Sequence, residues 1–337
     1  MTVGMPLRAM QQLAQRAQET GYSGLVITEA GRTAYLSCAA AALAADIDIL
    51  TGVAVAFPRS PMVTAQNAWE LADASGGRFR LGLGTQVRAH IERRYGADFA
   101  PPGPRMRDYL LAVRACFEAF GSGGPLDHHG PYYDLSLLPA MWSPGPIAVG
   151  APPIDIAAVN PWMLRLAGEH ADGVHVHPLN TPTYLRETVV PSLAEGASRS
   201  GRSLDEFEVI VPSFVVVGDT EDERTRWRER ARMQVAFYGS TPNYAFVFEQ
   251  VGHEGTTEAL RERQKAGDIP GMATVIGDDL LRHFIVEGTW STIADAIHER
   301  YAATATRVVN YFGAIGAADD PTWLDRWKPV SAALAAG

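Results

Sequence analysis

The sequence predicts an α/β protein folded as a closed (β/α)8 TIM barrel. Short runs rich in β-branched residues alternate with helical patterns, which implies a parallel sheet with helical crossovers. Eight such runs occur without a break into a second compositional block, which favours a barrel over an open six-stranded sheet. The length of 337 residues also suits one large barrel, because such barrels often exceed about 250 residues.

The first four strands are expected at residues 2–5, 25–28, 48–57 and 78–84. An alanine-rich helix at 34–45 separates the second strand from the third. After the third strand, Ser60 and Pro61 provide an N-cap and a favoured first helical residue, and Gly76 and Gly77 end that helix. A long amphipathic helix is expected at 104–120, behind the fourth strand.

The last four strands are expected at residues 154–159, 173–177, 208–218 and 307–311. The helices between them are expected at residues 161–170, 181–200 and 292–303. The seventh strand has the strongest sequence signal of the eight, because it contains three consecutive valines.

Two stretches interrupt the alternation and predict insertions after strands 4 and 7. Residues 121–150 are rich in glycine and proline, which indicates an irregular excursion. Residues 219–284 are mostly helical and contain the aromatic segment 237–244. Because this segment follows strand 7, we expect it near the barrel mouth, the alternative being an inert surface subdomain. Residues 1–337 as a whole are expected to form a single domain.

Composition limits the partners and the compartment. With 29 basic and 38 acidic residues the net charge is −9, which argues against nucleic acid or an anionic membrane as a main partner. No apolar run approaches the length of a membrane span, and no signal-peptide pattern is read at the N-terminus. Two cysteines are too few for a disulfide framework, so a reducing cytoplasm is expected.

Few motifs in the sequence point to chemistry. Gly82 and Gly84 end the fourth strand but lack the third glycine and the distant acidic residue of a dinucleotide fingerprint. They either let the backbone approach a flat ligand or serve packing. Arg88, Arg93 and Arg94 follow and either hold an anionic group or form a solvated helix surface.

Two histidines alternate along the sixth strand. His175 and His177 point to the same face, but no third ligand stands at a metal-site spacing, so no metal is expected. His177 ends its strand at the C-terminal rim, where it either contacts a ligand or is a structural histidine.

Four segments in order resemble the bacterial luciferase-like monooxygenase superfamily. They are Phe57–Gln66, Ser75–Thr85, Leu166–Gly173 and Gly196–Arg202. Within that superfamily they are most similar to the actinobacterial branch of oxidoreductases that use coenzyme F420, a deazaflavin hydride carrier. The resemblance extends over about residues 21–313.

The resemblance implies a barrel with a flavin or deazaflavin ring at its C-terminal mouth. In the family the third strand carries a bulge with a non-prolyl cis peptide behind the ring, which here falls within Gly52–Ala56. The implied cofactor-binding residues are Glu29, Ala54, Val55, Ala56, Thr85, Gln86, His90, Val159, Asn160, Pro161 and His177. His90 and His177 are also the expected catalytic groups, and Tyr238 and Tyr244 are expected to contact the substrate.

Two departures from the family pattern bear on the reaction. Related F420-dependent sugar-phosphate dehydrogenases carry His and Glu where this chain has Ala30 and Val87. Neither residue can act as a general acid or base, so that activity is not expected.

The sequence therefore predicts a cytoplasmic, homodimeric enzyme that transfers hydride between coenzyme F420 and a small organic substrate and binds no metal. One alternative is a monooxygenase that uses reduced FMN and oxygen. Another is a non-catalytic paralogue that binds a cofactor without turnover.

Overall fold

A computed structural model of the chain describes residues 1–336, which divide into two compact units. Unit 1 comprises Met1–Ala158, Trp162–His175 and Leu193–Glu208. Unit 2 comprises Val159–Pro161, Val176–Ser192 and the described chain from Val209 onward.

The strands of unit 1 follow one another in the order β1, β2, β3, β5, β8, β9. Their bounds are β1 Thr2–Val3, β2 Gly24–Thr28, β3 Asp48–Thr51, β5 Phe79–Gly84, β8 Ile154–Ala158 and β9 Gly173–Val176. A short strand β4, Ala54–Val55, continues the course of β3 and pairs in parallel with the C-terminal end of β5. The pairs β1–β2, β2–β3, β3–β5 and β5–β8 are also parallel.

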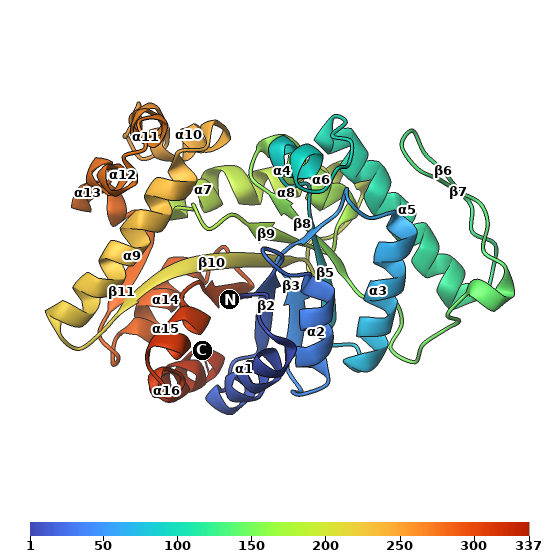
Figure 1. The fold of residues 1–337 in the computed structure, drawn as a ribbon, viewed down its shortest axis with the longest axis horizontal. Helices are drawn as coiled ribbons and strands as arrows, with labels where there is room; N and C mark the ends of the chain where they lie inside the picture. The colour runs from blue at the N-terminus through green and yellow to red at the C-terminus, as the bar shows by residue number, and fades with distance from the viewer. Residues whose placement is uncertain (337) are drawn as a thin grey trace. The chain divides into compact units, whose positions relative to one another are not determined.

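Helices connect these strands and cover them. Figure 1 shows α1, α2 and α3 side by side against β2, β3 and β5. The helices of this unit are α1 Leu7–Thr20, α2 Ala34–Ala42, α3 Pro61–Ala74, α4 Arg88–Arg93, α5 Pro102–Ser122 and α6 Pro161–His170. The predicted start of α3 is confirmed, because the Ser60 side chain accepts a hydrogen bond from the Val63 N–H and Pro61 is the first helical residue.

The predicted excursion after strand 4 is also confirmed. It contains a two-stranded hairpin, β6 His128–His129 and β7 Asp134–Leu135, and a single 3-10 turn, Ala140–Trp142. The hairpin is anchored on α5, where the buried carboxylate of Asp108 accepts hydrogen bonds from the backbone N–H groups of Tyr132 and Tyr133.

A buried ion pair joins two neighbouring strands of unit 1 near their N-terminal ends. Arg80 of β5 donates to both carboxylate oxygens of Asp155 on β8, at 3.0 and 2.6 Å. His175 of β9 lies beside this pair, with its Nε2 3.8 Å from Asp155 Oδ2 and without a hydrogen-bond partner in the described chain. Burial lowers the pKa of His175 to about 3, so the imidazole is neutral.

Unit 2 is built on one long strand, β10 Glu208–Val217. Its first half pairs in parallel with β12 Arg307–Asn310, and its second half pairs in parallel with β11 Ile285–Gly288. The sequence did not predict β11, because only four residues form it and they follow a long helical segment. The eight predicted strands are nevertheless all present.

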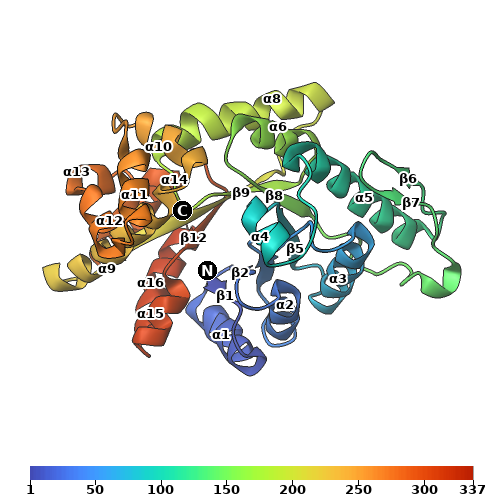
Figure 2. The same cartoon turned by 45° about the horizontal axis from the view of Figure 1, so that its top comes forward.

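The predicted helical insertion after strand 7 is confirmed. Figure 2 shows α10, α11, α12 and α13 gathered beside α9. The insertion comprises α9 Glu221–Gly239, a 3-10 turn Pro242–Tyr244, α10 Ala245–Glu249, α11 Thr256–Lys265, α12 Ile269–Val275 and α13 Asp278–Leu281. Thr220 and Glu223 form a capping box at the start of α9, which explains where the insertion begins.

The other helices follow β9, β11 and β12. They are α7 Pro182–Tyr184, a π-helical turn Leu185–Val189, α8 Val190–Ser200, α14 Ile293–Tyr301, α15 Gly313–Asp319 and α16 Trp323–Ala336. The sequence predicted one continuous helix at 181–200, and the structure divides it because the π turn interrupts the α-helical hydrogen bonding.

Candidate functional site

In unit 1, Glu29 and Arg59 hold the end of the third strand in place. Glu29 follows β2 and is buried, and its Oε2 accepts a hydrogen bond from the Val55 N–H at 2.7 Å. Arg59 donates to both oxygens of this carboxylate, at 2.9 and 2.5 Å, and to the Val55 carbonyl at 2.9 Å. Burial alone would lower the pKa of Arg59, but its bonds to Glu29 raise it overall.

The backbone between β3 and β4 has the conformation that the resemblance implied. The Gly52–Val53 peptide bond is cis, within the expected segment Gly52–Ala56. Thr28 Oγ1 donates to the Gly52 carbonyl at 2.7 Å. Ala54, Val55 and Ala56 are buried, so these small residues present backbone groups rather than long side chains.

His175 packs beneath this segment. A Cβ atom added to Gly52 would lie 3.5 Å from His175 Cε1, and one added to Gly82 would lie 2.5 Å from His175 Nε2. A Cβ at Gly82 would also lie 2.0 Å from the Thr51 carbonyl oxygen. Gly82 is therefore explained by packing against the Thr51 backbone and the imidazole, and packing is one of the two alternatives that the sequence left open.

The chain leaves β5 through a group of polar residues. Thr85 is half-buried, Gln86 and His90 are exposed, and Gln86 has a φ of 56°, which is uncommon for a residue other than glycine. Gln86 Oε1 accepts a hydrogen bond from the Val87 N–H, whereas the Thr85 hydroxyl has no partner within residues 1–336.

Helix α4 carries the arginines that the sequence singled out. Arg88 pairs with Glu92 at 2.9 Å, and Arg94 donates to the Ala30 carbonyl. Arg93 is exposed and has no ion-pair partner in the described chain. The Arg93 guanidinium, in the helix that follows Thr85 and Gln86, is thus available to a ligand.

Unit 2 brings together His177, Tyr238, Tyr244 and Tyr311, which we call the aromatic cluster. The imidazole centroid of His177 lies 4.7 Å from that of Tyr238 and 4.4 Å from that of Tyr244. The Tyr238 and Tyr311 hydroxyls are 2.7 Å apart, and Tyr311 also bonds Gln234 at 3.1 Å. The helical insertion therefore contacts His177, which follows β9, and Tyr311, which follows β12.

The expected cofactor-binding residues after the fifth predicted strand, β8, also belong to unit 2. Val159 is half-buried and its carbonyl accepts a hydrogen bond from the Tyr184 hydroxyl at 2.6 Å, while Asn160 and Pro161 are exposed. Burial raises the pKa of Tyr184, so the phenol is protonated.

Thus the structure places the predicted residues in two groups, one in each unit. Glu29 contacts Val55 in unit 1, and His177 contacts both predicted tyrosines in unit 2. Sequence reasoning missed Arg59, Gln234 and Tyr311. Arg59 lies within Phe57–Gln66, the first segment that resembles the family, and this was the one signal that could have identified it as a candidate site residue.

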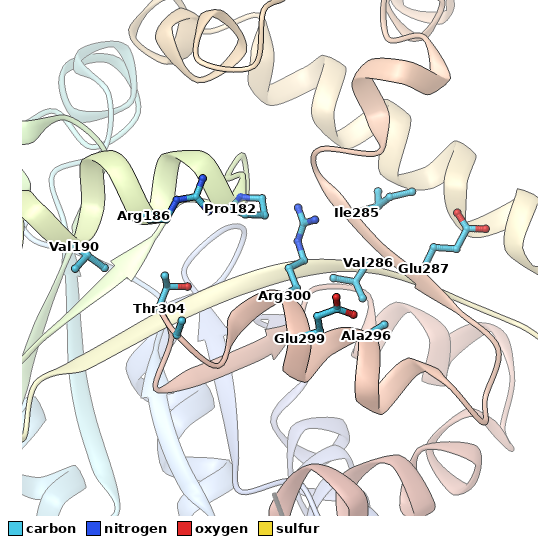
Figure 3. Close-up of a pocket in the computed structure, with 11 residues that line it drawn as sticks. Pro182, Arg186, Val190, Ile285, Val286, Glu287, Ala296, Glu299, Arg300 and Thr304 are labelled. Atoms are coloured by element: carbon cyan, nitrogen blue, oxygen red, sulfur yellow. The ribbon is translucent and has the colours of Figure 1, made fainter.

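A separate pocket of about 570 Å³ lies in unit 2 between α7, β11 and α14 (Figure 3). Arg186, Arg300 and Glu299 line it together with Val190 and Ala296. None of the predicted site residues is among its lining residues.

No group of three or more His, Cys, Asp or Glu side chains within residues 1–336 is arranged to hold a metal ion. In the same part of the chain, no helix combines the length and hydropathy needed to cross a membrane.

Comparison with known proteins identifies the class. The family described as luciferase-like monooxygenase matches residues 1–307, and the chain belongs to this family. The protein is therefore a luciferase-like oxidoreductase with an α/β barrel fold.

Several relatives are similar over most of their length. An uncharacterized protein of Mycobacterium tuberculosis is 37% identical over 296 residues, 88% of this chain and 87% of the relative. The 5,10-methylenetetrahydromethanopterin reductase of Methanopyrus kandleri is 29% identical over 286 residues, 80% of this chain and 78% of the relative. The solved structure of the coenzyme F420-dependent tetrahydromethanopterin reductase of that organism has a TM-score of 0.79 at 24% identity, covering 100% of this chain and 97% of the other.

Proposed function

We propose that this oxidoreductase transfers a hydride between coenzyme F420 and a small organic substrate. Similar proteins support the choice of cofactor. A putative coenzyme F420-dependent oxidoreductase of Mycobacterium tuberculosis is 25% identical over 322 residues, 88% of this chain and 89% of the relative. The methanopterin reductase structure described above is also of an F420-dependent enzyme.

The observation that carries the proposal is the set of free polar groups after β5. The Thr85 hydroxyl and the Arg93 guanidinium have no partner within residues 1–336, and His90 is exposed on the same segment. A deazaflavin or flavin cofactor needs hydrogen-bonding groups for its ring and cations for its anionic tail. The residues present in unit 1 therefore fit such a cofactor.

The third-strand segment is the proposed support for the planar ring. Ala54, Val55 and Ala56 have no long side chain that would hold a flat ligand away from the backbone. Glu29 and Arg59 fix the Val55 N–H and carbonyl, so this support is rigid before any ligand binds. In unit 2, Val159, Asn160 and Pro161 are the proposed contacts for the cofactor tail.

When bound, F420 supplies or accepts the hydride, and this chain's own residues position the substrate and exclude water. His177, Tyr238 and Tyr244 are the proposed substrate-binding residues. Burial holds the pKa of Tyr244 at about 12 and that of His177 at about 3, so both side chains are uncharged at neutral pH.

The proposed setting is a homodimer in the cytoplasm that acts on small molecules. Leu36 and Leu43 of unit 1 are 58% and 72% exposed, which is apolar surface that a second copy could cover. The net charge of −9 argues against nucleic acid and anionic membranes as partners.

Oxygen consumption separates the proposal from a monooxygenase reaction. The protein would be incubated with a panel of small ketones and alcohols, either with F420 or with FMN plus a flavin reductase. We expect turnover that depends on F420 and consumes no oxygen beyond the rate without protein. Substrate-dependent oxygen consumption that requires reduced FMN would instead establish the alternative.

A further inference from the structure

We propose that His177 binds the substrate through a fixed Nε2–H donor, and that the aromatic cluster accepts uncharged molecules with a carbonyl oxygen. This inference rests on the proposed function, because only that function makes the bound molecule a substrate. It assigns His177 a role as a binding and specificity residue rather than a general base.

The tautomer of His177 follows from a backbone contact. The Leu179 N–H donates to His177 Nδ1 at 3.1 Å, so Nδ1 must carry a lone pair. A neutral imidazole with a lone pair on Nδ1 carries its proton on Nε2. Asn180 holds the same turn, because its side-chain amide donates to the carbonyls of His177 and Pro212 at 3.0 and 2.9 Å. The orientation of the ring is therefore fixed by the turn itself.

The Nε2–H group is the part of His177 that a ligand can use. His177 has no further hydrogen bond or ion pair within residues 1–336. Its Nε2 is also not enclosed, unlike the Nε2 of His175, which is buried without a partner. The rings of Tyr238 and Tyr244 flank the imidazole at interplanar angles of 84° and 42°. A ligand that reaches Nε2 would contact aromatic walls.

The neighbouring tyrosines have a defined hydrogen-bond direction. Tyr311 donates its hydroxyl proton to Gln234 Oε1 at 3.1 Å, so its oxygen must accept from Tyr238, 2.7 Å away. The Tyr238 hydroxyl proton is therefore already donated to Tyr311 and is not available to a ligand. The Tyr244 hydroxyl has no partner in the described chain and is a second group available to a ligand.

Within residues 1–336, no ionised side chain contributes to the pKa shifts of His177, Tyr238 and Tyr244. Burial alone lowers the pKa of His177. Burial, followed by the effect of Tyr238, raises that of Tyr244. Burial, followed by Tyr311, raises that of Tyr238. An ionic ligand would lose hydration here without gaining a counter-charge, whereas an uncharged carbonyl oxygen matches a neutral N–H donor.

The experiment uses the full chain with two probes of similar shape, acetophenone and benzoate. Saturation-transfer NMR and competition titrations would measure their binding without any cofactor. We expect acetophenone to bind and benzoate to bind at least about tenfold more weakly, because only benzoate is charged. His177→Phe should weaken acetophenone about fivefold, by removal of one hydrogen bond, while His253→Phe in the same unit should leave it unchanged.

A second readout addresses the tautomer directly. Two-bond 1H–15N correlation spectra of labelled protein should show His177 with a protonated Nε2 and a bare Nδ1 from pH 5 to 8. Protonated Nδ1, titration of His177 near pH 6.5, equal binding of benzoate, or no acetophenone binding would each overturn the inference. None of these readouts requires F420, so they are independent of the cofactor proposal.

Discussion

The carboxylate of Glu29 accepts the backbone N–H of Val55 at 2.7 Å, which ties the end of β2 to β4. Arg59 completes this arrangement, since it bonds both the Glu29 carboxylate and the Val55 carbonyl. The Glu29 side chain is 4% exposed and the Arg59 side chain 19%, so the pair is largely removed from water. The segment proposed to support the cofactor ring is thus held by a charged pair.

We expect Glu29→Ala to lower the free energy of unfolding by about 3 kcal/mol, because it leaves the Arg59 guanidinium and the Val55 N–H unpaired. Urea denaturation of the two proteins would measure the difference. Glu29→Gln keeps an acceptor and should lose less. In the double variant Glu29→Gln/Arg59→Met, which removes both charges, the loss should be smaller than the sum of the single losses. Equal stability of Glu29→Ala and the natural protein would contradict this interpretation.

Acid should destabilise the protein through His175. The unfolded chain protonates this residue near pH 6.5, whereas the folded chain holds its pKa at about 3. The unfolded state therefore binds more protons between these values, and stability falls as the pH decreases from 6.5 toward 3. The slope for one such histidine is about 1.4 kcal/mol per pH unit.

Thermal unfolding of His175→Gln between pH 4 and 8 tests this effect. His177 shifts in the same direction, so the variant should lose part of the pH dependence and not all of it. The exposed His298 provides the matched control, and His298→Gln should keep the full dependence. A His175→Gln variant with unchanged pH dependence would show that this imidazole is not held neutral.

Tyr238 and Tyr311 should be energetically coupled. Tyr238→Phe removes one hydrogen bond and should cost about 1 kcal/mol in unfolding free energy, whereas Tyr311→Phe also removes the bond to Gln234 and should cost about 2 kcal/mol. Because both changes break the same Tyr238–Tyr311 bond, the double variant should cost less than the sum of the two. A double-mutant cycle by urea denaturation measures this coupling, with Tyr132→Phe as a control on a more exposed tyrosine. Strict additivity would argue against the bond.

Arg93 should contribute to binding of the anionic cofactor tail. Arg93→Ala is expected to weaken F420 binding by about fivefold at low salt, and the difference should shrink as salt is added. Arg8→Ala, which removes the same charge from the exposed surface of α1, should have no such effect. If both variants bind F420 as the natural protein does at every salt concentration, then Arg93 makes no cofactor contact.

The sequence predicted the strands well because their signals are local. The valine run of β10 and the Ser60–Pro61 start of α3 need no tertiary information. The strand β11 escaped prediction because only four residues form it and they directly follow a long helical segment, so no local signal marks it.

Site residues were predictable to a smaller extent. Glu29, His177 and Tyr238 were predicted from the family resemblance and the aromatic segment, and their place in a site stays a prediction. Arg59 and Tyr311 were missed because their importance comes from partners distant in sequence, Glu29 and Tyr238. Periodicity and spacing carry no information about such pairings, and only the folded chain shows them.

The most direct test of the account is a titration of the purified protein with F420 and with FMN at equal concentrations. Fluorescence quenching reports binding of both cofactors. The account predicts saturable binding of F420, with affinity at least about tenfold higher than that for FMN. Tight binding of FMN without measurable binding of F420 would contradict it.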